Sequence, residues 1–406
     1  MNSPRQKISV FEHQTITYGK SYFGVKFKES HFNALAKLNE LHDNKYFTLV
    51  HKGVKFSSYV GVIQIGDLIL EVLPKIDRSE ESPVLWKDVL IEMLRTTRKL
   101  KVNNIGNAFV AKQHIHLLDI YFEWFLNEVQ ALIHQGLIKK YYKQTSNVKA
   151  LKGKLEFANH IQKNLVHKER FYTTHQIYGT NHLEHQILGL ALKIIAQFSN
   201  GTYLYSKCKT VQLDFPEVDL VKPHPGLFSK LVYNRKNKAY KTALEIARII
   251  ILNFAPSVSS GNEKMLALLF DMNDLWEEYV LIKLKSLKIE GLKVIGQSSK
   301  RFWHNVSIRP DIIIQKNDEV FVIDTKWKHI QSNKPSTHDL RQMFVYNRYW
   351  GSYRALLLYP SNRTEKPSFM PFEEEQQECA VGKINIIEND SLKSNLGFDI
   401  INWLTK

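Results

Sequence analysis

The chain has 406 residues, of which 44% are hydrophobic and 12% aromatic, enough to fill the cores of two or three globular domains. Its formal net charge of +16 favours a polyanionic partner, with nucleic acid ahead of an acidic membrane surface. The two cysteines, Cys208 and Cys379, exclude a disulfide framework and a cysteine-rich zinc site.

Neither a signal peptide nor a membrane-spanning segment is expected. The N-terminal residues lack an apolar core of signal-peptide length, and no apolar run approaches the ~20 residues that a spanning helix requires. Together with the low cysteine content, this predicts a cytoplasmic protein without a membrane partner.

The first part of the chain, residues 1–130, is expected to form a β-rich domain. A helix is expected over 31–41, and the apolar run over 59–73, interrupted by Gly66, predicts a β-hairpin. Composition alone does not separate a partner-binding module from a small structural β domain.

Residues 131–257 are expected to form a mainly helical, basic region. Apolar and aromatic spacing predicts a long helix over 115–142 and an amphipathic helix over 183–198. The stretch 139–154, KKYYKQTSNVKALKGK, interleaves lysines with tyrosines. This pattern suits phosphate contact combined with base stacking, but it is also typical of a solvated basic face, and the sequence leaves both interpretations open.

A Pro-, Ser- and Gly-rich segment at 255–261 predicts the boundary of a last domain, residues 258–406. The elements expected there are a helix over 263–287, a hairpin over 309–328, a helix over 340–350 and a buried strand over 354–359. Pro335 and Ser336 together with Asp339 predict the N-terminus of the helix that continues over 340–350. This order predicts an α/β core with a mixed sheet flanked by helices. The expected fold class is therefore α+β and multidomain, with a β-rich N-terminal domain, a central helical region and a C-terminal α/β domain.

The expected C-terminal hairpin, RPDIIIQKNDEVFVIDTKWK, carries the candidate functional residues. Its two β-branched runs flank Asn317 and Asp318, residue types that tolerate the positive φ of a two-residue turn. In that register Asp311 lies directly opposite Asp324 on one face. Lys326, two residues beyond Asp324, points to the same face.

Two carboxylates this close repel each other unless a cation lies between them. Because Mg²⁺ takes hard oxygen ligands, Asp311 and Asp324 are candidate Mg²⁺ ligands, with Mn²⁺ as an alternative ion. Lys326 would then orient or activate a water, or stabilise charge on a phosphate. The competing interpretation is a structural Asp–Lys pair on an ordinary hairpin.

Two acids on the preceding helix compete for the place of a third site acid. Glu277 has mostly apolar neighbours one or two turns away, whereas Glu278 lies on the polar side. A charge held against a core needs a partner or a function, so Glu277 is the candidate, with Glu278 or a plain surface position as the alternatives. On the following helix Gln342 and Tyr346 share one face, from which they could contact a DNA phosphate or base.

The order of these residues resembles the PD-(D/E)xK nuclease superfamily, in the branch with a Q-x-x-x-Y helix. The matching positions are Pro310-Asp311, Asp324-Thr325-Lys326, Glu277 upstream and Gln342 with Tyr346 downstream. Other segments are similar to McrC, a subunit of the McrBC modification-dependent restriction systems: GVIQIGD from Gly61, EVLPKI from Glu71, LKGKL from Leu151, YNRKNKAY from Tyr233 and LLLYP from Leu356.

The resemblance implies a Mg²⁺-dependent endonuclease subunit that cleaves modified double-stranded DNA together with McrB, a GTP-hydrolysing AAA+ motor expected as a hexamer. It implies that the three acids lie at the metal, the lysine at the attacking water and the Gln–Tyr pair at the DNA strand. It also implies that the N-terminal part docks on the motor and stimulates GTP hydrolysis. Thr325 stands where alanine is frequent; its side chain is small and is expected to point to the opposite sheet face, so little consequence is expected.

The sequence contains no G-x-x-x-x-G-K-[ST] loop, so this chain is not expected to bind a nucleotide. Two alternatives to the nuclease subunit stay open. One is a non-catalytic, DNA-binding adaptor that activates the motor and has structural carboxylates. The other is a self-sufficient repair-type nuclease that needs neither GTP nor a partner.

Overall fold

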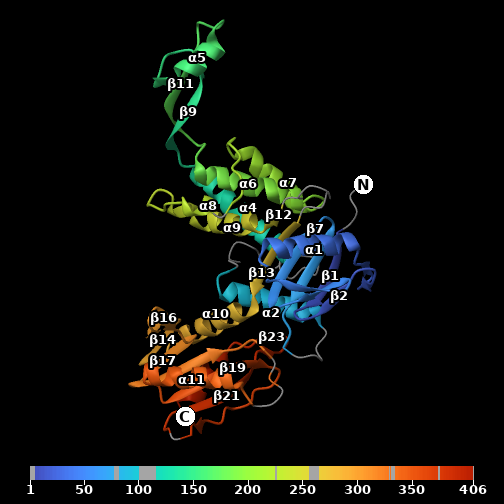
Figure 1. The fold of residues 1–406 in the computed structure, drawn as a ribbon, viewed down its shortest axis with the longest axis vertical. Helices are drawn as coiled ribbons and strands as arrows, with labels where there is room; N and C mark the ends of the chain where they lie inside the picture. The colour runs from blue at the N-terminus through green and yellow to red at the C-terminus, as the bar shows by residue number, and fades with distance from the viewer. Residues whose placement is uncertain are drawn as a thin grey trace. The chain divides into compact units, whose positions relative to one another are not determined.

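The computed structural model describes residues 5–76, 82–99, 116–224, 226–255, 265–328, 330, 334–373 and 375–405. The chain forms two compact units, drawn in Figure 1. Unit 1 contains Asn103–Leu268 with Met1–Pro4, and unit 2 contains Arg5–Val102 with Leu269–Lys406. Unit 2 therefore joins segments from both ends of the chain, whereas the expected domains 1–130, 131–257 and 258–406 follow chain order. No helix within the described ranges is long and apolar enough to cross a membrane.

The N-terminal part of unit 2 is built on strands β1 (Gln6–Phe11), β7 (Tyr59–Ile65) and β8 (Leu68–Leu73). β8 pairs in parallel with β1 and antiparallel with β7. The predicted β7–β8 hairpin is confirmed, and Gly66 takes the positive φ of 54° at its turn. The other elements of this part are β2 (Thr15–Thr17), β3 (Ser21–Tyr22), β4 (Val25–Lys26), α1 (Glu29–Leu41), β5 (Phe47–Val50), β6 (Gly53–Phe56) and α2 (Pro83–Thr96).

The C-terminal part of unit 2 carries a mixed sheet. Its strands are β14 (Leu292–Gly296), β17 (Ile312–Lys316), β18 (Glu319–Thr325), β19 (Arg354–Ser361), β20 (Met370–Pro371) and β21 (Glu378–Asn385). They form a six-stranded sheet in the order β14–β17–β18–β19–β21–β20. The β18–β19 and β19–β21 pairs are parallel and the others antiparallel, so the predicted mixed sheet is confirmed. The remaining elements are α10 (Met272–Lys285), β15 (Lys300–Trp303), β16 (Val306–Ile308), α11 (Thr337–Trp350), β22 (Ile387–Glu388), β23 (Ser391–Leu392) and α12 (Leu396–Leu404).

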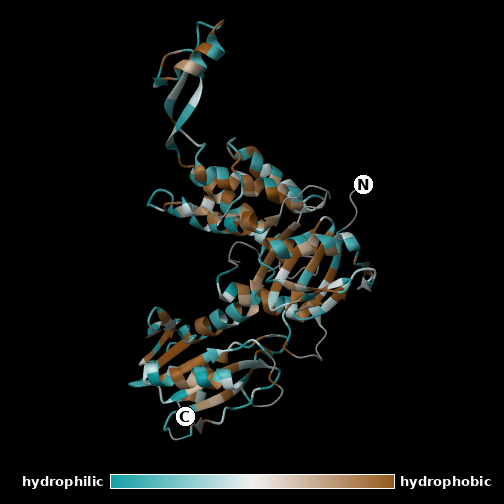
Figure 2. Cartoon of the chain, in the orientation of Figure 1, coloured by the Kyte–Doolittle hydropathy of each residue, from teal (hydrophilic) through white to brown (hydrophobic). Residues whose placement is uncertain are grey.

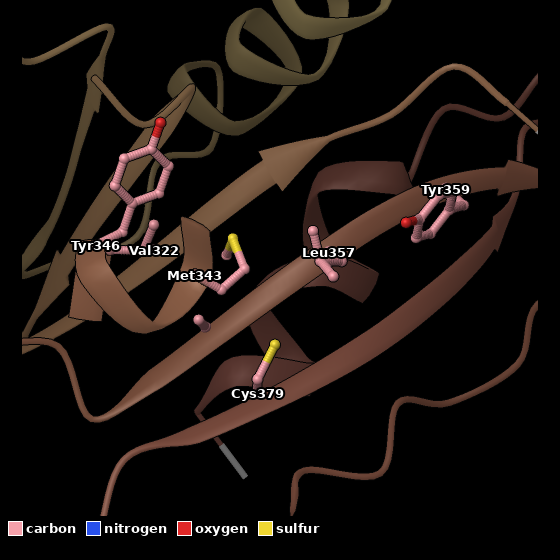
Figure 3. Packing of buried hydrophobic residues seen from close by; sticks show 7 residues of the cluster. Val322, Met343, Tyr346, Leu357, Tyr359 and Cys379 are labelled. Atoms are coloured by element: carbon pink, nitrogen blue, oxygen red, sulfur yellow. The ribbon is translucent and has the colours of Figure 1, made fainter. Parts of the chain in front are cut away.

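Helix α11 packs against this sheet through a buried apolar cluster. Met343 of α11 lies among Val322 of β18 and Leu357 of β19, and all three side chains are fully buried. Tyr346 adds its ring to the cluster, while Figure 3 shows its hydroxyl pointing away from the other labelled side chains. Burial of one face of α11 therefore fixes the position of the polar atoms at its edge.

One predicted helix is wrong in its first part. The segment expected as a helix over 263–287 contains a strand, β13 (Met265–Asp271), before α10 begins. The carboxylate of Asp271 accepts a hydrogen bond from Asn273 N at 2.9 Å, which caps the helix at its true start. The apolar run before it pairs with β12 (Phe254–Ala255), so its backbone groups are satisfied in a ladder.

Unit 1 consists of a helical body and an arm. The body contains α4 (Leu117–Gln135), α6 (Leu183–Phe198), α7 (Tyr203–Asp214), α8 (Gly226–Ser229), the 3₁₀ turn η1 (Lys238–Tyr240) and α9 (Lys241–Leu252). The arm contains β9 (Lys140–Val148), β10 (Lys154–Leu155), α5 (Phe157–Asn164) and β11 (Phe171–Gly179). β9 and β11 pair antiparallel and project from the body, with α5 near the far end (Figure 1).

The arm overturns the prediction of one long helix over 115–142. Helix α4 ends at Gln135, where Gly136 takes a φ of 88° that stops the helix. The lysine–tyrosine run continues as β9, because its backbone groups pair with β11. The central region is therefore helical in its body and β-structured in its basic stretch.

A buried carboxylate holds the base of the arm. Glu184 of α6 is 3% exposed, lies 2.9 Å from His182 Nδ1 and accepts a hydrogen bond from Asn237 Nδ2 at 3.1 Å. It also forms an ion pair with Lys140 at the start of β9. Burial by itself would raise the pKa of Glu184, but these partners outweigh burial and hold the pKa well below its usual range.

We expect Glu184→Gln to lower the free energy of unfolding at pH 7 by about 2 kcal/mol, because Lys140 loses its buried counter-charge. A carboxyl whose pKa is lowered by folding stabilises the protein above its unfolded pKa, and this contribution is lost as pH falls through the folded pKa. The effect should therefore shrink below about pH 4.5. Chemical denaturation of the full chain at pH 7 and pH 4 measures it. The exposed Glu217, changed to Gln, is the control, and an equal loss in both variants would contradict the prediction.

A second buried carboxylate connects the two segments of unit 2. Glu12, which follows β1 and is 4% exposed, accepts hydrogen bonds from Lys75 N at 2.8 Å and from Trp327 Nε1 at 2.7 Å. Trp327 packs against Trp276 of α10, with ring centroids 5.7 Å apart. Burial raises the pKa of Glu12 to about 7, although both hydrogen bonds oppose the increase.

Because folding raises the pKa of Glu12, the folded state binds this proton more tightly than the unfolded state does. Ionisation of Glu12 should therefore lower stability as pH rises from about 4.5 to about 7. Glu12→Gln keeps an acceptor oxygen for Trp327 and should remove this decline, which amounts to roughly 3 kcal/mol. Free energies of unfolding measured between pH 4.5 and 8 test this, with the exposed Glu40→Gln as control. Parallel pH curves for wild type and Glu12→Gln would refute it.

Candidate active site

The β17–β18 hairpin has the register that the sequence predicts. Lys316 pairs with Glu319, and Asn317 and Asp318 form the turn with positive φ values of 49° and 67°. The pairing runs to Ile312 opposite Ile323, and one further step places the two candidate aspartates opposite each other.

The two aspartates have different partners. Asp311 Oδ2 accepts hydrogen bonds from Thr325 N at 2.7 Å and from Thr325 Oγ1 at 2.9 Å. Asp324, 1% exposed, pairs through Oδ2 with Lys326 Nζ at 2.7 Å. The expectation that threonine at 325 has little consequence is therefore wrong, because its hydroxyl donates a hydrogen bond to a site carboxylate.

Burial disfavours ionisation of both aspartates, and repulsion by Asp311 adds to this effect at Asp324. Burial raises the pKa of Asp324 to about 6, and the charge of Asp311 adds to the increase. Burial raises the pKa of Asp311 as well. Burial acts to lower the pKa of Lys326, but Asp324 and Asp311 outweigh it, so the net shift is upward and the ammonium stays charged. The site thus contains one charged ammonium group, that of Lys326, and two carboxyl groups. Binding of a further cation would keep both carboxyl groups ionised.

The structure separates the two acids of α10. Gln297 Nε2 donates a hydrogen bond to Glu277 Oε1 at 2.8 Å, and the pKa of Glu277 is raised by burial and by the charge of Asp311. Glu278 instead forms an ion pair with Lys99 from the N-terminal segment. Glu277 is therefore the α10 acid that lies within electrostatic reach of the aspartates.

Gln342 and Tyr346 lie at the site, where they contact protein groups. Gln342 Nε2 donates to Asp324 Oδ1 at 3.2 Å and to the Tyr346 hydroxyl at 2.8 Å. The Tyr346 hydroxyl donates to Arg309 O at 2.9 Å. The pair thus orients Asp324 and the segment that enters β17.

The predicted start of α11 is confirmed, since Ser336 Oγ accepts a hydrogen bond from Asp339 N in the first turn of the helix.

Two site residues were missed by the sequence analysis. Gln297, with a φ of 53°, donates its backbone N–H to Asp311 O at 2.9 Å in addition to its contact with Glu277. No motif marks it, because it approaches the carboxylates from a loop after β14. Thr325 stood out in the sequence only because alanine is frequent at its position. The signal that could have marked it as a site residue is its hydroxyl group, which donates a hydrogen bond to Asp311.

The residues fit a magnesium ion that takes most of its ligands from water and substrate. Within the described part of the chain, no three His, Cys, Asp or Glu side chains form a group that could hold a metal. Mg²⁺ usually keeps several waters and is bound by one or two carboxylates together with substrate phosphates. Asp311 and Asp324 supply such a pair, and their raised pKa values indicate a place where positive charge is favourable. A direct metal contact by Glu277 stays a prediction.

The fold and the site define an α/β domain with an acid–acid–lysine hairpin, joined to a further β-containing segment. The family model described as "McrBC 5-methylcytosine restriction system component" matches residues 54–360. The chain belongs to this family, and the resemblance to McrC in its sequence is confirmed.

Two comparisons support the assignment. The chain is 22% identical over 271 residues to the type IV methyl-directed restriction enzyme EcoKMcrBC of Escherichia coli K12, covering 60% of this chain and 77% of that protein. Its fold matches a chain from the refined half-complex of a tetradecameric assembly of Thermococcus gammatolerans McrB AAA+ hexamers with bound McrC. The TM-score is 0.70 at 18% identity, over 98% of this chain and 100% of that chain.

Proposed function

We propose that this chain is the metal-dependent endonuclease subunit of a McrBC-type restriction complex, with a PD-(D/E)xK site that hydrolyses phosphodiesters of double-stranded DNA. The observation that carries the proposal is the convergence of Asp311, Asp324 and Lys326 on one hairpin, with Asp324 also held by Gln342. These are the residue types that hold a hard cation and stabilise phosphate charge.

Bound Mg²⁺, or Mn²⁺ in its place, would lower the pKa of a coordinated water and neutralise charge on the phosphate. Asp311 and Asp324 would hold the ion, and Thr325 and Gln342 fix the orientation of these two carboxylates. Lys326 positions the attacking water and stabilises the developing charge. Glu277 assists from α10.

The partner proposed for this chain is a McrB-like AAA+ GTPase hexamer, because the structural neighbour is McrC bound to McrB AAA+ hexamers. This chain would stimulate GTP hydrolysis by that partner without binding a nucleotide itself. Docking by residues 1–130 stays a prediction. The arm of unit 1 offers a second surface, because Phe157, Ile161, Leu165 and Val166 near its tip are 62–84% exposed.

The test is reconstitution of the chain with its McrB-like partner, GTP and Mg²⁺ on methylated and unmethylated duplex DNA. Cleavage that requires partner, GTP and methylation supports the proposal. Cleavage by the chain alone would favour the self-sufficient nuclease, and GTPase stimulation without any cleavage would favour the adaptor.

A further inference from the structure

The segment between β14 and β17 contains the β15–β16 hairpin, and it contacts the candidate active site where it begins and where it ends. At its start, Gln297 donates its side-chain amide to Glu277 Oε1 at 2.8 Å and its backbone N–H to Asp311 O at 2.9 Å. At its end, Arg309 O accepts a hydrogen bond from the Tyr346 hydroxyl at 2.9 Å. The β15–β16 hairpin between these points is therefore tied to the site at both ends.

The hairpin is also seated on α11, the helix that carries the Gln–Tyr pair. Lys300 Nζ donates to Tyr349 O at 2.6 Å and lies 5.1 Å from the ring centroid of Trp350. The ring of Phe302 lies 5.5 Å from that of Tyr349. These contacts use one side of β15 and fix the hairpin as a platform beside the site.

The outer surface of the hairpin is exposed, aromatic and positively charged. Residues 299–307 are all exposed, and Trp303 is 72% exposed next to Arg301. The segment 299–309, SKRFWHNVSIR, contains no Asp or Glu, and Arg301 lies next to Trp303 on the side of β15 that does not contact α11. A large exposed ring beside a positive charge matches the stacking and phosphate contacts by which proteins hold nucleic acids.

We propose that the β15–β16 hairpin is a DNA-binding element of this site, in which Trp303 inserts between two base pairs near the scissile phosphate and stacks on a base that it partly unstacks, while Arg301 contacts the DNA backbone. The proposal rests on the proposed function for its ligand, since this hairpin adjoins the carboxylates that would act on DNA. Trp303 acts here as a binding residue and takes no part in the chemical step.

The experiment measures binding of the full chain to a duplex oligonucleotide that contains 2-aminopurine, in EDTA so that no cleavage occurs. Trp303→Ala should weaken binding roughly tenfold or more and remove the fluorescence change of 2-aminopurine that accompanies wild-type binding. Trp303→Phe should retain most of both signals. Arg301→Ala should weaken binding and reduce its salt dependence. Phe23→Ala is the control, because Phe23 is 73% exposed in the N-terminal segment.

Equal binding by wild type and Trp303→Ala would overturn the proposal, and so would the absence of DNA binding by the wild-type chain. Loss of binding to the McrB-like partner with unchanged DNA affinity would also overturn it, since the hairpin would then belong to a protein interface. Asp324→Asn separates this question from catalysis. That variant should lose cleavage but keep the 2-aminopurine signal. The binding measurement therefore tests the role of Trp303 even if no variant, and not even the wild type, cleaves DNA.

Discussion

Asp324→Asn is expected to abolish DNA cleavage by the complex of this chain with its McrB-like partner, lowering the rate roughly 10³-fold or more. Asp324 pairs with Lys326 at 2.7 Å and accepts a hydrogen bond from Gln342 at 3.2 Å, so its charge lies where the site residues meet. Asparagine keeps the size of the side chain but removes the charge that a divalent cation and Lys326 require. Cleavage of methylated duplex DNA with GTP and Mg²⁺ measures the effect.

The matched control lies on the same hairpin. Asp318 is exposed at the turn, where asparagine also tolerates the positive φ of 67°, so Asp318→Asn should cleave like wild type. Asp324→Asn should still form the complex with the partner, as judged by co-elution. Wild-type cleavage by Asp324→Asn would contradict the site assignment. Equal loss of cleavage in both variants would point to a general effect of removing one negative charge from the chain.

The hairpin could be predicted because its determinants are local. Two β-branched runs around Asn317-Asp318 set both the turn and the register, and the register alone places Asp311 opposite Asp324. The α11 start followed from Ser336 in the same way. Sequence patterns therefore yielded the acids, the lysine and the Gln–Tyr face.

Features that depend on distant segments could not be predicted. Gln297 reaches Glu277 from a loop, and Glu12 reaches Trp327 from the other end of the chain. The apolar run in β13 predicts a helix as readily as a strand, because a continuous apolar run fits both the helical and the strand periodicity. Pairing with a neighbouring strand decides the outcome. Likewise, β9 became a strand because β11 is present to pair with it.

The arm of unit 1 was predicted as a basic stretch, but its apolar side chains suggest a different partner from DNA. Phe157 and Ile161 are four residues apart on α5 and are 70% and 62% exposed, and Val166 beyond the helix is 84% exposed. Figure 2 shows hydrophobic residues at this end of the arm. Exposed apolar side chains grouped on a small element are typical of a protein-binding surface, whereas phosphate contact needs charge.

We therefore expect Phe157→Ser combined with Ile161→Ser to weaken binding to the McrB-like hexamer roughly 100-fold or more, because buried anchor residues dominate interface energies. Stability should change by less than about 0.5 kcal/mol per substitution, since neither side chain is buried in the chain alone. Leu213→Ser, at a residue 86% exposed on α7, is the control in the same unit. Partner affinity and DNA affinity are measured separately by titration of labelled protein. Unchanged partner binding with a salt-dependent loss of DNA binding would assign the arm to DNA, because releasing counterions from phosphates makes such contacts sensitive to salt.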